Sequence, residues 1–486
     1  MKKTIVIYDD TCKPNQEIAS ITGGKTYGQT IFKRVTLKDR MKEEISRCKT
    51  VGNFLVYDNP EEEEKLKREL INEKGKGGGQ SVVYLYSNFG LADTHEFQTI
   101  LTKAAYVEQT YVALCDEKLA AAVFSDIDTA LEALDLLQTR RMQALQIENH
   151  AFTDLSVLGN FLNFITSGFD ARFFNALAGD EHTVTKRSTK IEKIKAEYNF
   201  YYLLPDNMKM WFVMPYDYKE DAQGASYTME RFHMTDIAIR FVHGAVSAQE
   251  LSDILDKLFY FINLRKKKAV DEKQAKEVSD DLYLKKVRSR MKELAAFPQY
   301  HYFNTLIEMG TEYDSIDDIL RHYEMLYEKV NSLFPQANTN ELVIGHGDLC
   351  FSNILYSREA SLLKLIDPKG AVTEGELYTD MYYDLAKLSH SICGCYDFFN
   401  SGLFQITMDR DMKLMLSVDT DARPYIRIFQ QYLQENGFVY TKVRLLEASL
   451  FLSMLPYHMD QPGKVFGFLL NAIRILQEVE QECTRI

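Results

Sequence analysis

Short apolar runs rich in β-branched and aromatic residues alternate with longer polar segments over the first third of the chain. This spacing is typical of an α/β domain, in which buried strands alternate with helices. An amphipathic stretch from Ser125 to Gln146 closes the region. The predicted strands are Thr4–Tyr8, Phe54–Tyr57, Val82–Tyr86 and Tyr111–Leu114.

The pattern changes near Phe152, where short β segments and one helix continue up to Phe232. Beyond Ser247 the chain is strongly helical, because Ser247 and Glu250 form a predicted capping box and apolar residues follow at helical spacing. We therefore expect three parts: an α/β Rossmann-like domain over residues 1–148, a β-rich lobe over 149–235 and a helical lobe over 236–486.

Composition narrows the class of protein. The 486 residues carry 57 Lys and Arg against 70 Asp and Glu, a net charge of −13, which argues against a nucleic-acid-binding protein. A hydrophobic content of 46% excludes general disorder. Seven cysteines, an odd number, predict free thiols in a reducing compartment. The first apolar run is too short for a signal peptide, so we expect a cytoplasmic protein with no membrane span and leave its oligomeric state open.

The segment from Leu342 to Gly370 carries the candidate chemistry. An apolar strand leads into His346-Gly347-Asp348, Asn353 follows five residues later, and a second strand ends at Asp367. A hairpin centred near residue 360 would set Asn353 opposite Asp367, within one residue of register and with Cβ atoms about 5 Å apart. Carboxylate and amide oxygens suit Mg²⁺, and Asp348 remains to accept a proton.

The sequence HGDLCFSN at 346–353 resembles the catalytic loop of the aminoglycoside phosphotransferase and choline kinase family, whose members are relatives of protein kinases. The resemblance implies an α+β, kinase-like bilobal fold that uses ATP and Mg²⁺. It implies that Asp348 is the catalytic base and that Asn353 and Asp367 are metal ligands. It also implies that Asp384, in the sequence Tyr-Asp-Leu-Ala at 383–386, braces the catalytic loop.

A kinase-like lobe should also offer a lysine to the phosphates and a glutamate to hold that lysine. Lys186 lies at the end of a strand-like run, and Thr189 to Glu192 form a predicted capping box that opens a helix. At about 100° per residue, Glu197 flanks the buried face of this helix and Glu192 points to solvent. We predict that Glu197 is the partner of Lys186; the alternative is an ordinary surface charge pair.

The nucleotide loop departs from that of protein kinases, because no glycine-rich motif precedes Lys186. We assign phosphate contacts to the turn at Ser167 and Gly168, and adenine contacts to the backbone from Met229 to Phe232, where the resemblance places the hinge. The sequence ASITGGKT at 19–26 is similar to a phosphate-binding loop, but the preceding strand ends about ten residues earlier. A plain turn is the favoured interpretation.

These features predict an ATP- and Mg²⁺-dependent kinase that phosphorylates a hydroxyl of a small molecule. Only sixteen residues separate Asp367 from Asp384, which leaves little room for a peptide-docking segment. The acceptor could be choline-like, aminoglycoside-like, or a sugar or polyol. The alternative is a nucleotide-binding pseudokinase that serves an N-terminal domain loosely similar to sugar nucleotidyltransferases. Aromatic residues near Asp380 and Asp397 enclose a cationic group, stack on a sugar ring or form core; they are Tyr382, Tyr383, Tyr396, Phe398 and Phe399.

Overall fold

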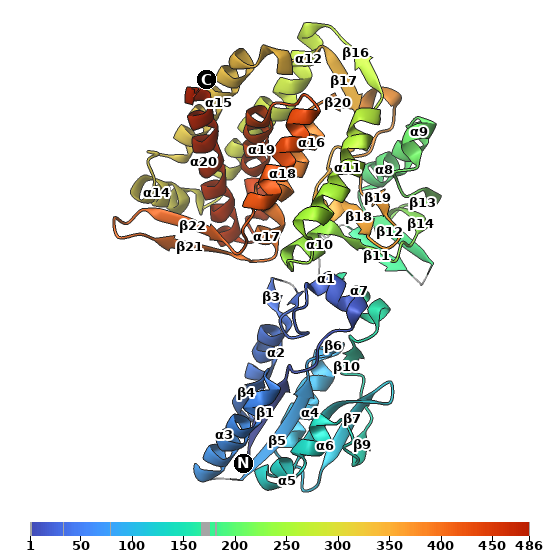
Figure 1. Ribbon diagram of the computed structural model, residues 1–486, viewed down its shortest axis with the longest axis vertical. Coiled ribbons are helices and arrows are strands. Elements are labelled where there is room, and N and C mark those ends of the chain that lie inside the picture. Colours follow the sequence, from blue (N-terminus) through green and yellow to red (C-terminus); the bar gives the residue numbers. More distant parts are fainter. Residues whose placement is uncertain (1, 33, 78, 167–174, 180–181, 486) are drawn as a thin grey trace. The chain divides into compact units, whose positions relative to one another are not determined.

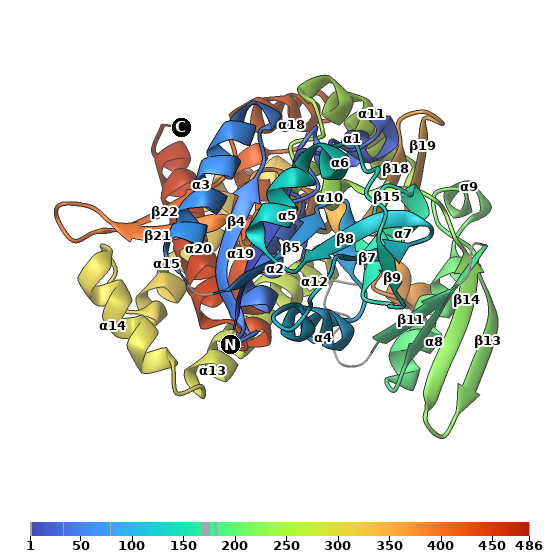
Figure 2. The ribbon, with the colours of Figure 1, turned by 90° about the horizontal axis from the view of Figure 1, so that it is seen from below.

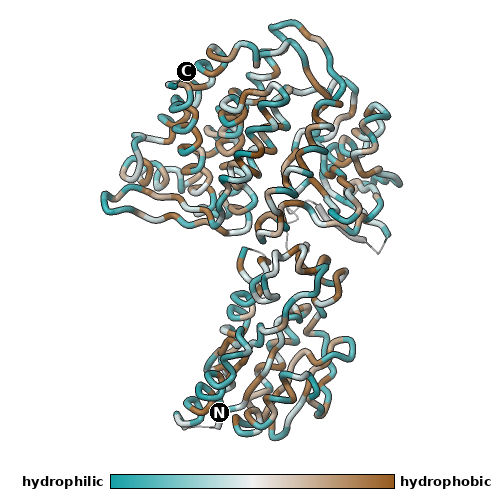
Figure 3. Tube along the Cα trace, in the orientation of Figure 1, coloured by the Kyte–Doolittle hydropathy of each residue, from teal (hydrophilic) through white to brown (hydrophobic). Residues whose placement is uncertain are grey.

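The structure, a computed structural model, describes residues 2–32, 34–77, 79–166, 175–179 and 182–485 (Figure 1). The chain divides into two compact units. Unit 1 comprises residues 1–170 with 243–245, and unit 2 comprises 171–242 and 246–486. Each unit has its own hydrophobic core, and apolar segments are present in both (Figure 3).

Unit 1 is built around a six-stranded sheet with the order β4-β1-β5-β8-β7-β9. Strand β1 runs parallel to β4 and β5, whereas β8 runs antiparallel to both of its neighbours, β5 and β7. The sheet is therefore mixed and departs from the fully parallel Rossmann arrangement. The strands are, in sheet order, Val51–Tyr57 (β4), Lys3–Asp9 (β1), Gln80–Tyr86 (β5), Lys118–Phe124 (β8), Tyr111–Cys115 (β7) and Leu145–Ile147 (β9).

Helices cover both faces of this sheet. The crossovers β1–α2–β4 and β4–α3–β5 run in opposite directions along the sheet, so right-handed connections place α2 and α3 on opposite faces. Helix α4 contacts α2, and α5 contacts α3 (Figure 2). The stretch predicted as one amphipathic segment is two short helices followed by β9. The helices are Gln16–Thr22 (α1), Leu37–Ser46 (α2), Glu63–Gly75 (α3), Thr94–Ala104 (α4), Ile127–Glu132 (α5), Leu134–Gln138 (α6) and Leu158–Thr166 (α7).

Two sequence expectations for this region are settled by local structure. Gly23 ends helix α1 in the left-handed conformation, with φ 64°, so the Gly-Gly-Lys sequence follows a helix instead of opening one. This excludes a phosphate loop and leaves the turn. Beyond the predicted boundary at residue 148, Phe152–Asp154 (β10) pairs with Phe89–Leu91 (β6), and this pairing extends unit 1 past that boundary.

The small sheet of unit 2 carries the order β11-β12-β14-β13. Helix α8 packs on it through a small cluster of Ile194, Ala225 and Tyr227. The predicted capping box at Thr189 does not form, because the helix begins one residue later, with Lys190 at its N-cap and no side-chain cap. The elements are Asn175–Gly179 (β11), Thr183–Ser188 (β12), Pro215–Asp221 (β13), Gly224–Glu230 (β14) and Ile191–Leu203 (α8).

The rest of unit 2 is mainly helical and is centred on α19, which is buried over almost its whole length. Helix α19 contacts α13, α15, α16 and α20. Helix α11 begins as predicted, since the Ser247 hydroxyl accepts a hydrogen bond from the Glu250 N–H at 3.1 Å. The larger helices are Ala248–Leu264 (α11), Glu272–Asp280 (α12), Lys286–Ala295 (α13), Tyr300–Gly310 (α14), Ile316–Leu333 (α15), Tyr383–Ile392 (α16), Arg423–Glu435 (α18), Tyr440–Met454 (α19) and Pro462–Arg485 (α20).

Two small sheets support the segment that carries the candidate chemistry. Strand β17 lies between β16 and β20, and β18 lies between β15 and β19. Helix α16 begins only at Tyr383, and the residues before it pair with β17 as β20. Among the residues that the structure describes, no helix has the length and apolarity of a membrane span. The strands are Thr235–Asp236 (β15), Lys267–Ala269 (β16), Glu341–Ile344 (β17), Ile354–Ser357 (β18), Leu362–Leu365 (β19) and Tyr378–Asp380 (β20).

Candidate active site

The loop after β17 is held by one buried carboxylate, that of Asp384 at the start of α16. The backbone N–H groups of His346 and Gly347 donate to its two oxygens at 3.0 and 2.9 Å, and Arg265 Nη1 lies 3.1 Å away. Asp384 and Arg265 are both almost fully buried, so the loop is anchored from inside the lobe. This is the bracing contact that the family resemblance implied.

His346 fixes the loop from a second direction. Its Nδ1 accepts a hydrogen bond from the Asp348 N–H at 3.1 Å, so its Nε2 is the nitrogen that donates to the Ile366 carbonyl, at 2.9 Å. The ring also stacks on Phe212. Burial lowers the pKa of His346 and outweighs the nearby carboxylates, so the ring is a neutral structural link between the loop after β17 and the residue that follows β19.

The Asp348 side chain is held at both of its oxygens. Lys387 Nζ lies 2.8 Å from Oδ1, and Asn353 Nδ2 donates to Oδ2 at 3.1 Å and to the Asp348 carbonyl at 2.8 Å. The side chain is still 43% exposed. Burial raises the pKa of Asp348, but the Lys387 ammonium outweighs that effect and holds this pKa below its usual value. Asp348 is thus an ionised, oriented and accessible carboxylate.

The observed pairing of β18 with β19 is shifted by one residue from the predicted central register, which is within the one-residue range of that prediction. Ile354 pairs with Leu365 and Ser357 with Leu362, which places Asn353 opposite Ile366, and the Ile366 N–H donates to the Asn353 carbonyl at 3.0 Å. Asp367 therefore follows the residue that faces Asn353. It adopts the left-handed conformation, with φ 53°, which is uncommon for a residue with a side chain.

Lys186 connects the two parts of unit 2 through ion pairs with the buried Glu197 and the half-exposed Asp367. Its Nζ lies 2.8 Å from Glu197 Oε2 on α8 and 2.8 Å from Asp367 Oδ1. The Tyr227 hydroxyl also donates to Glu197, at 3.2 Å. Burial lowers the pKa of Lys186, but the carboxylates of Asp367 and Glu197 outweigh it, so this pKa is raised and the ammonium is retained.

The segment after Asp367 lies directly against helix α8. The Ala371 N–H donates to the Ala196 carbonyl at 3.0 Å, and a Cβ at Gly370, which has φ 89°, would come within 3.0 Å of Ala196 and Glu197. Glycine is therefore required for this close approach. The contact joins the segment that carries Asp367 to the helix that carries Glu197.

The predicted nucleotide contacts are placed only in part. Ser167 and Gly168 lie outside the described residues. Met229 pairs with Val184 near the end of β14, and Phe232 follows that strand with the Lys364 ammonium 5.5 Å from its ring centre. The segment predicted to be the hinge therefore lies beside the strand of Lys186.

The aromatic residues around α16 and Tyr396–Asn400 (α17) form core instead of a cage for a cation. Four of them, Tyr382, Tyr383, Phe398 and Phe399, are no more than 5% exposed and belong to the main cluster of unit 2. Asp380 is also engaged, since its Oδ1 accepts from the Tyr283 hydroxyl and from the Tyr382 N–H, each at 2.9 Å.

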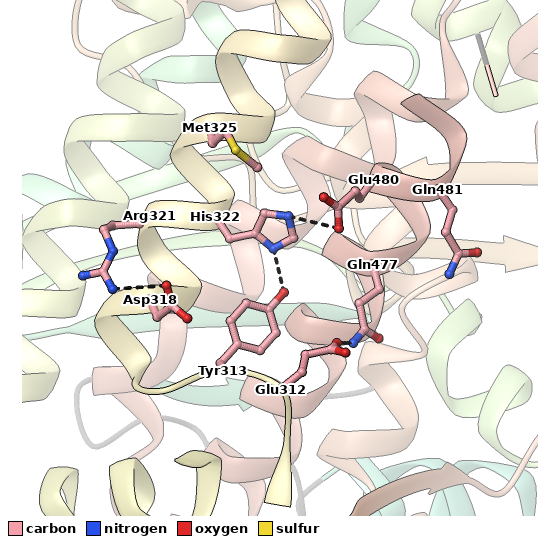
Figure 4. A pocket seen from close by; sticks show the side chains of 9 residues that line it. All are labelled: Glu312, Tyr313, Asp318, Arg321, His322, Met325, Gln477, Glu480 and Gln481. Carbon is pink, nitrogen blue, oxygen red and sulfur yellow. Dashed lines mark hydrogen bonds and ion pairs between the residues drawn. The ribbon is translucent and has the colours of Figure 1, made fainter. Parts of the chain in front are cut away.

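A surface hollow elsewhere in unit 2 is lined by residues of α15, α20 and the turn before α15 (Figure 4). His322 points toward Tyr313 and Glu480, with its Nδ1 2.6 Å from the Tyr313 hydroxyl and its Nε2 3.5 Å from Glu480. The Nδ1 contact is a hydrogen bond, whereas Nε2 has no hydrogen-bond partner among the described residues. The residues that line the hollow belong to elements other than those that carry Lys186, Asp348 and Asp367.

Sequence reasoning missed Lys387. The available signal was its position three residues after Asp384 in the sequence Asp-Leu-Ala-Lys, since residues three apart on a helix share a face. Because Lys387 shares a helix face with Asp384, which binds the loop after β17, a contact between Lys387 and that loop could have been predicted.

No family model and no curated protein matches this chain. Among solved structures, it is similar to a thermostable mutant of aminoglycoside phosphotransferase APH(4)-Ia, with a TM-score of 0.35 and 10% identity over 63% of this chain and 94% of that one. It is also similar to aminoglycoside phosphotransferase APH(3'')-Id from Streptomyces rimosus in complex with ADP and streptomycin, with a TM-score of 0.33 and 16% identity over 62% and 97%.

Proposed function

We propose that this chain is an ATP- and Mg²⁺-dependent phosphotransferase that moves the γ-phosphoryl group to a hydroxyl of a small molecule. One observation carries the proposal: Lys186 is buried between Glu197 and Asp367, and Asp367 follows directly on the hairpin of Asn353. A lysine held by a helix glutamate, two oxygen ligands and an accessible aspartate are the parts that phosphoryl transfer uses.

The donor set fits a magnesium ion shared with phosphates. Asn353 directs its amide nitrogen to Asp348, which leaves its oxygen for a metal, and Asp367 offers a carboxylate that is 45% exposed. Among the described residues, no group of three His, Cys, Asp or Glu side chains is placed to hold a metal alone. Mg²⁺ is commonly held by one or two carboxylates together with substrate phosphates, whose charge it neutralises.

The protein groups have separate tasks in this proposal. Lys186 binds phosphate oxygens, and its second partner Glu197 holds it in the site. A magnesium ion would be held by Asn353 and Asp367 and would neutralise charge on the phosphates. Asp348 accepts a hydrogen bond from the acceptor hydroxyl and takes its proton as the phosphoryl group moves. Because Asp348 is anchored through the loop that Asp384 braces, it keeps a fixed place relative to Asn353.

For the acceptor we propose a small hydroxyl compound: choline-like, aminoglycoside-like, or a sugar or polyol. The residues between Asp367 and Asp384 support this, since they pass along α8 and then pair as β20 with β17. Much of this segment therefore packs against α8 and β17, and little of it remains to dock a peptide.

The test is ADP release from ATP in the presence of Mg²⁺. The acceptors are choline, ethanolamine, aminoglycosides, free sugars and polyols, run beside a generic protein substrate. We expect one small-molecule class to raise ADP release above the rate in water, and the Asp348→Asn variant to abolish that increase. Nucleotide binding without any acceptor-dependent turnover would favour the pseudokinase alternative, and phosphorylation of the protein substrate alone would refute the small-molecule acceptor.

A further inference from the structure

Lys387 reaches Asp348 from helix α16, outside the catalytic loop. The Lys387 side chain is 16% exposed and the Asp348 side chain 43%, and their charged atoms are 2.8 Å apart. The ammonium therefore lies on the buried side of the carboxylate, and the exposed side stays open to a substrate.

Two donors from different elements hold the two oxygens of Asp348. Lys387 holds Oδ1 from α16, and Asn353 holds Oδ2 from the turn before β18. A carboxylate whose two oxygens are held by an ion pair and a hydrogen bond has little freedom to rotate. Helix α16 also supplies Asp384, which binds the loop backbone, so the same helix sets both the loop and the direction of its carboxylate.

We propose that Lys387 is a positioning residue for phosphotransfer, which fixes the orientation of the Asp348 carboxylate toward the acceptor hydroxyl. The proposal rests on the function proposed above. Asp348 raises the pKa of Lys387 well above its usual range despite burial, so the ammonium is present at neutral pH. Misplacement of a reacting group by about 1 Å can cost about 100-fold in rate, which is the scale expected here.

A purely structural role makes different predictions. Removing one partner of a buried ion pair destabilises a protein wherever the pair lies. A positioning role instead changes turnover without changing nucleotide affinity, and it is restored by another cation that reaches Asp348. Lys387→Met keeps the apolar stem and removes the charge, and Lys387→Arg keeps the charge.

The experiment compares the full-length wild type with K387M, K387R and the control K286M. Lys286 donates to the Tyr383 hydroxyl at 3.3 Å, at the start of the same helix, so K286M removes a lysine that contacts α16 away from Asp348. The readouts are crystal structures, thermal unfolding, and ADP release from Mg·ATP in water and with the acceptor panel. We expect K387M to lower kcat about 100-fold with KM for ATP within about twofold, K387R to recover most of the loss, and K286M to match the wild type.

The crystal structures test orientation without any acceptor. The Asp348 carboxylate should leave its wild-type rotamer in K387M and keep it in K286M. An unchanged rotamer in K387M, or a wild-type kcat, overturns the proposal. So does a loss of activity that K387R fails to restore and that accompanies a lower melting temperature. If wild type and D348N release ADP at the same rate with every acceptor, the proposed function fails, while the rotamer in K387M still decides whether Lys387 orients Asp348.

Discussion

Asp348 is the side chain on which turnover should depend most. Asp348→Asn keeps the size of the group but removes the negative charge and the proton acceptor, and its single oxygen can accept from Lys387 or from Asn353 but not from both. We expect kcat to fall about 10²- to 10⁴-fold while ATP affinity changes little, because a general base acts mainly in the transition state. Steady-state ADP release and binding of a fluorescent nucleotide measure the two quantities. A large loss of nucleotide binding would instead identify Asp348 as a metal or structural residue.

Asp367 should be required for metal-dependent turnover and not for folding. Its side chain is 45% exposed and pairs with Lys186, so Asp367→Ala removes a ligand from the edge of the site. We expect no Mg²⁺-stimulated ADP release from this variant and a far-UV circular dichroism spectrum like that of the wild type. Glu374→Ala, which removes an exposed carboxylate paired with Lys266, is the control and should retain activity. Normal activity of Asp367→Ala at low Mg²⁺ would refute the metal assignment.

At the scale of single residues, the sequence identified the pair of Lys186 and Glu197 because helix periodicity alone separates Glu197 from Glu192. Lys387 was not identified, since its contact is made across 39 residues of chain and depends on how α16 meets the loop. Local patterns predict which face of an element a side chain occupies. They do not predict which distant segment covers that face.

Among the elements, the hairpin from β18 to β19 shows why register is hard to predict. A polar turn centred at residue 360 was expected, but the loop comprises residues 358–361, with Ser361 at φ 49°, so its centre lies half a residue earlier. That half residue moves the facing partner of Asn353 from Asp367 to Ile366. Despite this shift, Asp367 still lies one residue beyond the position that faces Asn353 and contacts Lys186, because it follows directly after Ile366 and turns toward that lysine.

The buried pair of Arg265 and Asp384 should be a main source of stability for the elements around the loop after β17. Both side chains are no more than 1% exposed. Asp384→Ala therefore leaves the buried Arg265 guanidinium without its ion-pair partner and the His346 and Gly347 N–H groups without their hydrogen-bond acceptor. We expect a loss of about 3–5 kcal/mol in the free energy of unfolding, measured by urea denaturation. The control Glu341→Ala breaks an exposed pair with Lys267 and should cost less than about 1 kcal/mol. Equal losses in the two variants would contradict the bracing role.

At the scale of the whole molecule, buried carboxyls in unit 2 make its stability depend on pH. Burial raises the pKa of Asp236 and of Glu447 to about 7 and that of Asp397 to about 6. Between about pH 4 and 7 the folded chain therefore holds protons that the unfolded chain has released, and these groups lower stability as pH rises. Asp397→Asn mimics the protonated form. Its stability relative to the wild type should rise from pH 5 to pH 8, as measured by urea denaturation, and a constant difference would refute the raised pKa.

The two units should also unfold as separate cooperative blocks, because the structure gives each its own core. We therefore expect two transitions in differential scanning calorimetry of the full chain. A ligand that binds only the folded form stabilises it by about 2.7 kcal/mol at 100 times its Kd, so Mg²⁺ with a non-hydrolysable ATP analogue should raise one transition and leave the other in place. The Asp384→Ala variant identifies the responsive transition, since the pair it breaks lies wholly in unit 2. If the analogue raises the transition that Asp384→Ala leaves unchanged, the nucleotide binds unit 1, and the kinase site proposed on Lys186 is wrong.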